Sequence, residues 1–183
     1  MVLKATNIIG FQLGWLACVL GGAHGWPWLG MLLSLPVLAW HFWHAQPAWQ
    51  EVRLLLLVAL SGGVLDQAML SLTLVSYPAE NWPDQILPAW MWMLWMLFAS
   101  TLNVGLRWLR GHAIAAVLFG LAGGPLAYFG ASRLGAIDLV GGLGTLSIIS
   151  LAWGVLTPAL IWLSIRLDGY SRLDSLDGGL SRV

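Results

Sequence analysis

Six apolar stretches follow one another along the chain, and short polar or glycine-containing segments separate them. A helix needs about 20 predominantly apolar residues to cross the hydrocarbon core of a bilayer, and each stretch is close to that length. The pattern therefore predicts six transmembrane helices: about Ala5 to Gly22, Pro27 to about His44, about Val52 to Val75, Leu87 to about Leu109, His112 to Gly130, and Leu143 to Leu167.

The segments between and after these stretches define the domain organisation. Ser76 to Ile86 is polar, acidic and rich in turn-forming residues, and Ala131 to Gly142 contains glycines and Arg133. The residues from Asp168 onwards include serine, aspartate and glycine and no apolar run, which is typical of a loosely ordered tail. We expect one transmembrane domain over residues 1–167 and a short tail over residues 168–183.

Basic residues orient the predicted helices in the membrane. With six spans, both termini and the loops after the second and fourth spans lie on one side. Seven of the eight basic residues fall in those segments: Lys4, Arg53, Arg107, Arg110, Arg166, Arg172 and Arg182. The other side holds only Arg133, and its longest loop is acidic through Glu80 and Asp84. Because basic loops stay on the cytoplasmic side, we expect both termini in the cytoplasm.

Composition supports a membrane protein and excludes several other classes. The chain is 59% hydrophobic and 9% charged, whereas a soluble domain has about 25% charged residues. Eight basic and eight acidic residues give no net charge, so we expect no nucleic-acid partner. A single cysteine, Cys18, excludes a disulfide within the chain. Gly141 to Gly144 lacks the Lys-Ser or Lys-Thr of a nucleotide-binding loop, and we expect no cofactor.

Small residues mark faces where helices of a membrane bundle pack. Four of the predicted spans carry such a face, so a compact bundle is favoured over loosely associated helices. The small or polar positions are Gly10, Gly14 and Cys18; Ala59, Gly62 and Gly63; Gly120 and Gly124; and Ser147, Ser150, Gly154 and Thr157.

Asp66 is the only acid that the pattern places deep within an apolar stretch, in the segment Ser61-Gly62-Gly63-Val64-Leu65-Asp66. Counting from Arg53 at about 1.5 Å per residue places Asp66 about 20 Å along its helix. That position lies in the outer half of a core about 30 Å thick. The same counting puts residues 93–95 and Tyr128 at a similar depth and Arg133 slightly further out.

We therefore predict an outer-half polar cluster of Asp66, Tyr128 and Arg133, with two interpretations. Acids within membranes are enriched at functional sites, so the cluster is a candidate proton site, substrate ligand or catalytic acid. Alternatively, Asp66 bonds to Tyr128 or pairs with Arg133 and holds the bundle together.

A second candidate, the inner polar stripe, consists of Ser100, Asn103 and Arg107, which share one helical face because they lie three and four residues apart. Arg107 and Arg110 suit contact with a phosphate or lipid headgroup. The alternative is that the arginines extend to the interface while one polar residue makes an interhelical hydrogen bond.

Histidines offer a third arrangement. His41 and His44 share a helical face, and His112 or Glu51 on the same side would complete a metal site. The favoured interpretation is that the imidazole rings are polar groups at a membrane interface rich in tryptophan, so we expect no metal.

Several motifs resemble those of a family of bacterial inner-membrane proteins of unknown function. The motifs are Phe11 to Trp15, the spacing from Gly62 to Asp66, Phe98 to Asn103, Gly124 to Tyr128, and Arg133 to Gly135. The resemblance covers about residues 5–165 and implies no catalytic or binding residues. It implies a bacterial inner-membrane location and a genomic association with enzymes similar to cyclopropane-fatty-acid synthases.

Three classes of function follow. The first, favoured by that association, is a membrane component of a lipid-modifying or envelope pathway, either an enzyme or an accessory protein. Its partners would be membrane lipids and other inner-membrane or lipid-modifying proteins. The second is a small proton-coupled transporter that uses Asp66. The third is a structural subunit of a membrane complex.

Overall fold

The structure, a computed structural model, describes residues 2–77, 83 and 85–173 of the chain. Its helices are α1 (Val2–Ala23), α2 (Pro27–His44), α3 (Ala48–Ser71), α4 (Ala89–Leu102), the 3-10 helix η1 (Arg107–Leu109), α5 (Ala113–Arg133) and α6 (Leu143–Arg166). Two short strands, β1 (Val75–Ser76) and β2 (Asp138–Leu139), pair antiparallel. Glu80 and Asp84 of the acidic loop lie outside the described residues.

The prediction of an all-helical membrane protein is confirmed at the level of fold class. Each of the six apolar stretches contains one α-helix. Within the described part of the chain, four of these helices are long and apolar enough to cross a membrane, namely α1, α3, α5 and α6. Helix α2 has 18 residues that include two histidines, and α4 has 14.

The predicted helix from Leu87 to about Leu109 is wrong over residues 103–109, because α4 ends at Leu102 and the chain turns before η1. Hydropathy misses this turn because Asn103 is its one polar residue and Val104, Gly105 and Leu106 continue the apolar pattern. The side-chain amide of Asn7 donates to the Ser100 carbonyl (3.0 Å), and its oxygen accepts from the Gly105 N–H (3.2 Å). Non-helical backbone at membrane depth requires such internal partners.

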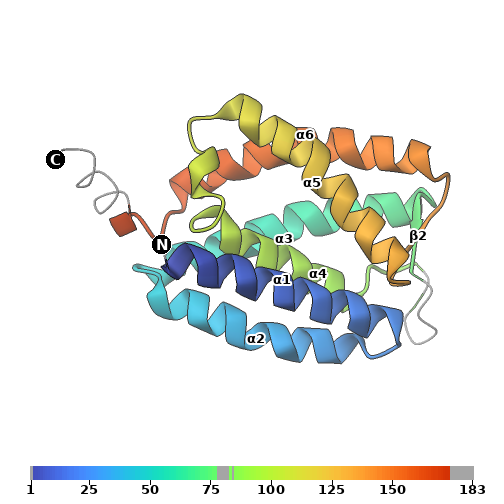
Figure 1. Cartoon of the computed structure of the whole chain (residues 1–183), viewed down its shortest axis with the longest axis horizontal. Coiled ribbons are helices and arrows are strands. Elements are labelled where there is room, and N and C mark those ends of the chain that lie inside the picture. The colour runs from blue at the N-terminus through green and yellow to red at the C-terminus, as the bar shows by residue number, and fades with distance from the viewer. Residues whose placement is uncertain (1, 78–82, 84, 174–183) are drawn as a thin grey trace.

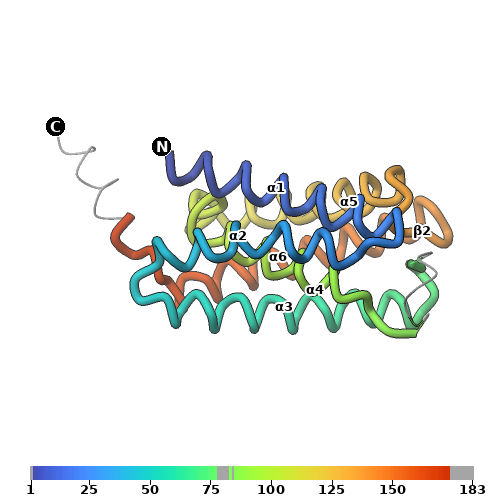
Figure 2. Tube along the Cα trace, turned by 90° about the horizontal axis from the view of Figure 1, so that it is seen from below, coloured from blue at the N-terminus to red at the C-terminus, as the bar shows by residue number. Residues whose placement is uncertain are grey.

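The helices run roughly along one axis (Figure 1). Helix α1 packs against α2 and α4, α3 packs against α4, and α5 packs chiefly against α6. Figure 2 shows α1 and α5 on one side of the bundle and α3 on the opposite side. The start of α1 and the end of α6 lie at one end, which we call the termini end (Figure 1). The β1–β2 pair lies at the other, the ribbon end, where it joins the α3–α4 connection to the α5–α6 connection.

Glycines in the bundle have two different packing roles. A Cβ added at Gly120 would lie 2.2 Å from the backbone oxygen of Trp153, so this glycine brings α5 close to the α6 backbone. By contrast, a Cβ at Gly62 would lie 1.9 Å from the Trp95 ring, and one at Gly124 would lie 2.2 Å from the Trp153 ring. The small-residue faces therefore accommodate indole rings as well as neighbouring backbones.

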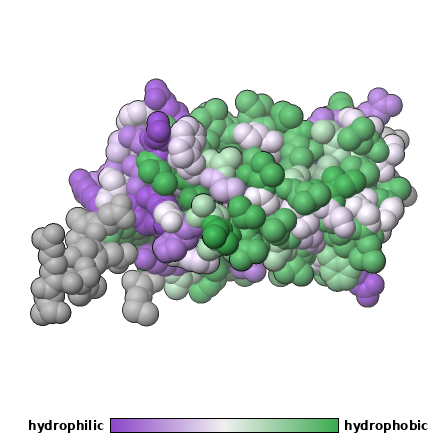
Figure 3. Space-filling model, turned by 90° about the horizontal axis from the view of Figure 1, so that it is seen from above, coloured by the Kyte–Doolittle hydropathy of each residue, from purple (hydrophilic) through white to green (hydrophobic). Residues whose placement is uncertain are grey.

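The surface matches a membrane protein in its distribution of polarity. On the face shown in Figure 3, hydrophobic side chains cover most of the length of the bundle, and hydrophilic side chains gather at the termini end. Large apolar side chains that lie exposed on the helices include Leu13, Leu57, Leu118, Leu126 and Leu151.

Candidate functional site

Asp66 lies in the interior of the bundle, where only 1% of its surface is exposed. The indole N–H of Trp95 on α4 donates a hydrogen bond to Asp66 Oδ2 (2.6 Å). The hydroxyl of Tyr128 on α5 donates to Asp66 Oδ1. One carboxylate on α3 therefore accepts hydrogen bonds from two neutral donors on two other helices.

Gly62 explains how Trp95 reaches this carboxylate. Gly62 and Asp66 are four residues apart, so they lie on the same face of α3, one turn apart. Because Gly62 has no side chain, the Trp95 ring lies against the α3 backbone, and its N–H faces Asp66. Gly62, one turn before Asp66, thus leaves space on α3 for the Trp95 indole ring.

Arg133 does not join the cluster that the sequence predicted. Its side chain is exposed in the last turn of α5, and no ion pair links it to Asp66 in the described part of the chain. A guanidinium near the end of a membrane helix reaches polar surroundings more easily than the apolar interior. The structure therefore brings together Asp66 and Tyr128 and adds Trp95, which the sequence analysis placed at the right depth without assigning it a role.

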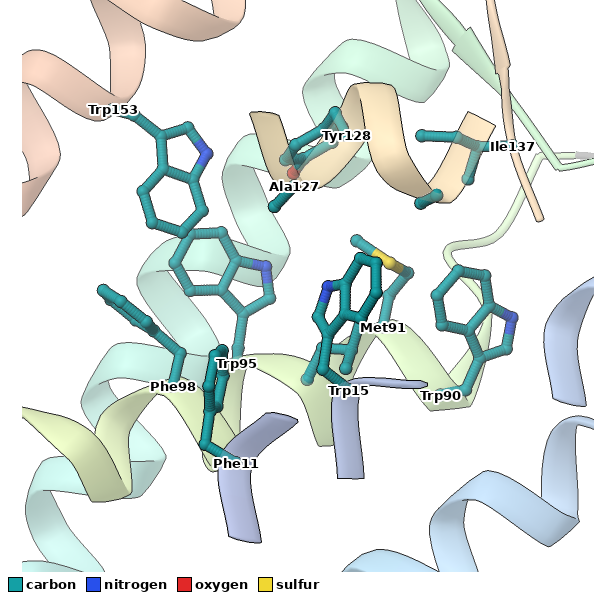
Figure 4. A pocket seen from close by; sticks show the side chains of 12 residues that line it. Phe11, Trp15, Trp90, Met91, Trp95, Phe98, Ala127, Tyr128, Ile137 and Trp153 are labelled. Atoms are coloured by element: carbon teal, nitrogen blue, oxygen red, sulfur yellow. The ribbon is translucent and has the colours of Figure 1, made fainter. Parts of the chain in front are cut away.

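Further aromatic residues surround this centre. The rings of Trp95 and Trp153 stack with their centroids 4.9 Å apart, and the Trp153 indole nitrogen is directed toward Tyr128 (Figure 4). From the ribbon end, Tyr77 approaches the same centre. Burial, followed by the nearby Asp66 carboxylate, raises the pKa of Tyr77 well above its ordinary value. The Tyr77 hydroxyl therefore stays protonated at physiological pH.

Trp95 and Tyr128 also line a cavity of about 70 Å³ between α1, α4, α5 and α6 (Figure 4). A larger cavity of about 630 Å³ adjoins it toward the termini end. The two cavities share five lining residues, Phe11, Trp15, Phe98, Ala127 and Trp153. We call the combined cavity the aromatic groove. Asp66 is not among its lining residues and lies directly behind two of them.

The groove opens on the surface of the bundle and is apolar. Its lining residues include Leu126, which is 67% exposed, and Trp108, which is 58% exposed. Gln12, Thr101 and Tyr128 are polar, and none of the described lining residues is charged. The exposed lining residues include Gln12 of α1 and Leu126 of α5, so the groove opens to the surface between these two helices.

The inner polar stripe divides in the structure. Ser100 is buried, and its hydroxyl donates to the Leu97 carbonyl of its own helix (2.7 Å). Asn103 and Arg107 instead belong to a second polar centre at the termini end, which we call the termini-end network. Its members are His41, Glu51, Asn103, Arg107, Arg110, Asp168, Gly169 and Tyr170.

Glu51 is fully buried at the centre of this network. Its Oε2 lies 2.9 Å from His41 Nε2. Its Oε1 accepts hydrogen bonds from the Asn103 side-chain amide (2.5 Å) and from the Gly169 N–H (2.8 Å). One carboxylate thus links α2, α3, the end of α4 and the segment after α6.

Asp168 supplies the second acid of the network. Arg107 donates to both of its carboxylate oxygens (3.2 and 2.8 Å), and Arg110 donates to one (2.8 Å). Burial alone would raise the pKa of Asp168, but the hydrogen bonds from the two arginines and from the Tyr170 N–H outweigh it and lower that pKa. Both arginines are therefore engaged by protein groups rather than presented to a lipid headgroup.

The segment after α6, assigned from the sequence to a loosely ordered tail, is packed over residues 168–170. The Tyr170 hydroxyl donates to the His41 carbonyl, and Tyr170 is 3% exposed. Residues 174–183 of that tail lie outside the described residues. The sequence signal for this network was the presence of two acids, Glu51 and Asp168, on the same predicted side as Arg107 and Arg110.

The histidines lie apart. His44 is exposed and its Nδ1 contacts the Trp40 carbonyl (2.9 Å), whereas His41 turns inward to Glu51. His112 is exposed, with its Nδ1 3.0 Å from the Arg110 carbonyl. Within the described residues, no group of three or more His, Cys, Asp or Glu side chains is placed to hold a metal ion.

Comparison with known proteins places the chain in a family. No curated protein and no solved structure matches the chain. Residues 4–159 match the family described as "Protein of unknown function (DUF2878)", which confirms the resemblance to a family of unknown function. Since the match covers most of the sequence, the chain belongs to the DUF2878 family.

Proposed function

We propose that this protein is a membrane component of a lipid-modifying or envelope pathway, as an enzyme or an accessory protein, and that the aromatic groove holds a hydrocarbon chain. The observation that carries the proposal is the groove itself. Its larger part, about 630 Å³, lies within the range of about 300–1,000 Å³ for small-molecule sites. Aromatic and aliphatic side chains dominate its lining.

The position of the groove favours a lipid chain as its occupant. The groove opens between α1 and α5, and both helices are long and apolar enough to cross a membrane. Lipid tails are therefore the molecules that surround the opening of a groove between two such helices. An uncharged lining suits a hydrocarbon chain, since it presents no charge that the chain would have to desolvate.

The proposal includes six membrane spans with both termini in the cytoplasm of a bacterial inner membrane. Seven of the eight basic residues fall in the termini or the loops on their predicted side, which supports that orientation. Helix α4, about 21 Å long at 1.5 Å per residue, is largely buried by the other helices. It therefore needs less contact with lipid than the four helices that are long and apolar enough to cross a membrane.

Lipid analysis of a deletion strain tests the proposal. We expect the lipid profile to change on deletion and to return with the wild-type gene. Gly123→Leu should not restore it, because Gly123 lines the groove and the leucine side chain would fill it. The backbone position accepts a side chain, since a Cβ at Gly123 would meet only Phe119, at an ordinary 3.7 Å. The matched control is Gly144→Leu, since nothing lies within 4 Å of a Cβ at Gly144. An unchanged lipid profile on deletion would count against the proposal.

A second candidate function is a small proton-coupled transporter that uses Asp66. It is favoured by the direct hydrogen bonds that two residues lining the groove donate to Asp66. In proteoliposomes, Asp66→Asn should then abolish a pH-dependent flux while the protein still accumulates. A structural subunit would instead co-purify with a partner at fixed stoichiometry.

A further inference from the structure

Gln12 is the polar residue at the rim of the aromatic groove. It lies on α1 between Phe11 and Leu13, its side chain is exposed, and it lines the larger cavity. Within the described part of the chain, no hydrogen bond joins its side-chain amide to another residue. The two hydroxyl groups of the lining are engaged, because the Thr101 hydroxyl donates to the Phe98 carbonyl (2.6 Å) and the Tyr128 hydroxyl donates to Asp66.

The depth of Gln12 makes this unusual. Helix α1 begins at Val2, so Gln12 lies about 15 Å along it at 1.5 Å per residue. In a core about 30 Å thick, that position is near the middle of the bilayer. A carboxamide offers two N–H donors and one oxygen acceptor. Water and lipid headgroups are absent at this depth, so leaving these groups without partners is costly.

The dimensions of the groove indicate how a ligand reaches Gln12. Along α5 the lining extends from Phe119 to Ala131, which is about 18 Å at 1.5 Å per residue. One leaflet of a core about 30 Å thick measures about 15 Å. A single chain that enters from the interface near Trp108 therefore passes Gln12 partway along its length and not at its headgroup.

We propose that the ligand of the groove is a fatty chain with an oxygen function, a hydroxyl or a carbonyl group, along its length, and that Gln12 hydrogen-bonds that oxygen. The inference rests on the proposed function and names the ligand class for the same groove. An ordinary saturated tail presents only methylene groups at this depth. Gln12 thus distinguishes oxygenated chains from the bulk lipid that surrounds the protein.

Ligand binding to the full-length protein in detergent tests this inference. The probes are stearic acid and hydroxystearic acid with its hydroxyl at mid-chain, and their affinities are compared on the same protein by native mass spectrometry. We expect the wild type to prefer the hydroxylated chain by about tenfold, the ratio that one hydrogen bond in an apolar site supports. Gln12→Leu should bind both chains with the affinity that the wild type shows for stearic acid.

The comparison remains informative if a variant is less stable, because the preference is a ratio measured on one protein. Gln46→Leu is the matched control, since Gln46 is exposed in the α2–α3 connection, away from the groove. It should keep the preference. Equal affinities in the wild type would overturn the inference and leave the proposed function standing. If neither chain binds, both the inference and the proposed function are contradicted.

A second copy of the chain is the alternative partner for an exposed glutamine in a membrane helix. Gln12→Cys tests it, because the native Cys18 is fully buried and serves as the unreactive control in the wild type. We expect the variant to remain monomeric when native membranes are treated with a membrane-permeant oxidant. A disulfide-linked dimer would show that Gln12 faces another protomer and would overturn the inference.

Discussion

Two buried acids, Asp66 and Glu51, belong to polar centres of different kinds. Asp66 accepts hydrogen bonds from two neutral side chains that line a groove. Glu51 links four chain segments near a pair of arginines and a second acid. Both acids are almost completely shielded from solvent. The extent of burial is therefore similar for the two acids. Their hydrogen-bond partners are what distinguish Asp66 from Glu51.

The comparison assigns different roles to the two centres. The termini-end network combines two arginines with two acids and joins the segments around the turn between α4 and η1. The Asp66 centre fixes the orientations of Trp95 and Tyr128 and so shapes the groove. Asp66 is in this sense a positioning residue for the walls of the proposed binding site. The following predictions test that division of roles.

The largest effect is expected for Glu51→Leu. The change leaves the Asn103 amide and the Gly169 N–H without their acceptor and removes the partner of His41 at a fully buried site. Breaking a buried charge network by removing one partner costs roughly 3–5 kcal/mol, so the protein should accumulate poorly and melt at a lower temperature. Asp138→Leu, at an exposed site, is the control. Normal accumulation of Glu51→Leu would show that the network is dispensable.

Gly62→Ala should have the next largest effect. The new methyl group would lie 1.9 Å from the Trp95 ring, so Trp95 must shift and lose its hydrogen bond to Asp66. Overpacking of this kind costs roughly 1–3 kcal/mol and should also weaken binding of a fatty chain. Gly123→Ala is the control, because its methyl group meets Phe119 at an ordinary 3.7 Å. Thermal unfolding in detergent measures both variants.

Asp66→Asn tests most directly whether the Asp66 centre and the termini-end network have different roles. The amide keeps one oxygen acceptor but must place its NH2 group toward one of two donors, so Trp95 or Tyr128 loses its partner. We expect a cost of about 1–3 kcal/mol, near-normal accumulation and clearly weaker binding of a fatty chain. If the variant accumulates as poorly as Glu51→Leu, Asp66 is a purely structural acid and the contrast between the centres fails.

The smallest effect is expected from the ionisation of Asp168. Its pKa is lowered from the ordinary 3.8 by the two arginines, despite its burial. A carboxyl group with a lowered folded-state pKa stabilises the fold above its unfolded-state pKa, and this contribution disappears as the pH falls through the folded value. Thermal stability should therefore decline below about pH 4 in the wild type. Asp168→Asn should be less stable at neutral pH and should lack this part of the decline.

Much of the fold was predictable because hydropathy and a few special residues mark the helix ends. Pro27 begins α2 as expected of a proline in the first turn. The end of α4 was not predictable, because Val104, Leu106 and Leu109 continue the apolar pattern through a turn. Hydropathy reports how apolar a residue is and carries no information about whether the backbone around it stays helical.

The candidate sites were predictable only in part. Depth counting put Asp66 and Tyr128 at the same level, and the structure joins them. Depth counting could not choose among residues at or near one level, so Arg133 was included and Trp95 received no role. The contacts between Glu51 and residues 168–170 depend on how the chain folds back after α6, which no local pattern encodes.

The α5–α6 pair is held to the rest of the bundle at its two ends. At the ribbon end, Ser76 pairs with Asp138 and Val75 with Leu139. At the termini end, Asp168 binds Arg107 and Arg110. Between these fixed points, the pair meets α4 largely through stacked rings such as Trp95 and Trp153. The middle of the pair is therefore joined to the rest of the bundle through side chains, including the hydrogen bond from Tyr128 to Asp66, whereas its two ends are fixed through the connections.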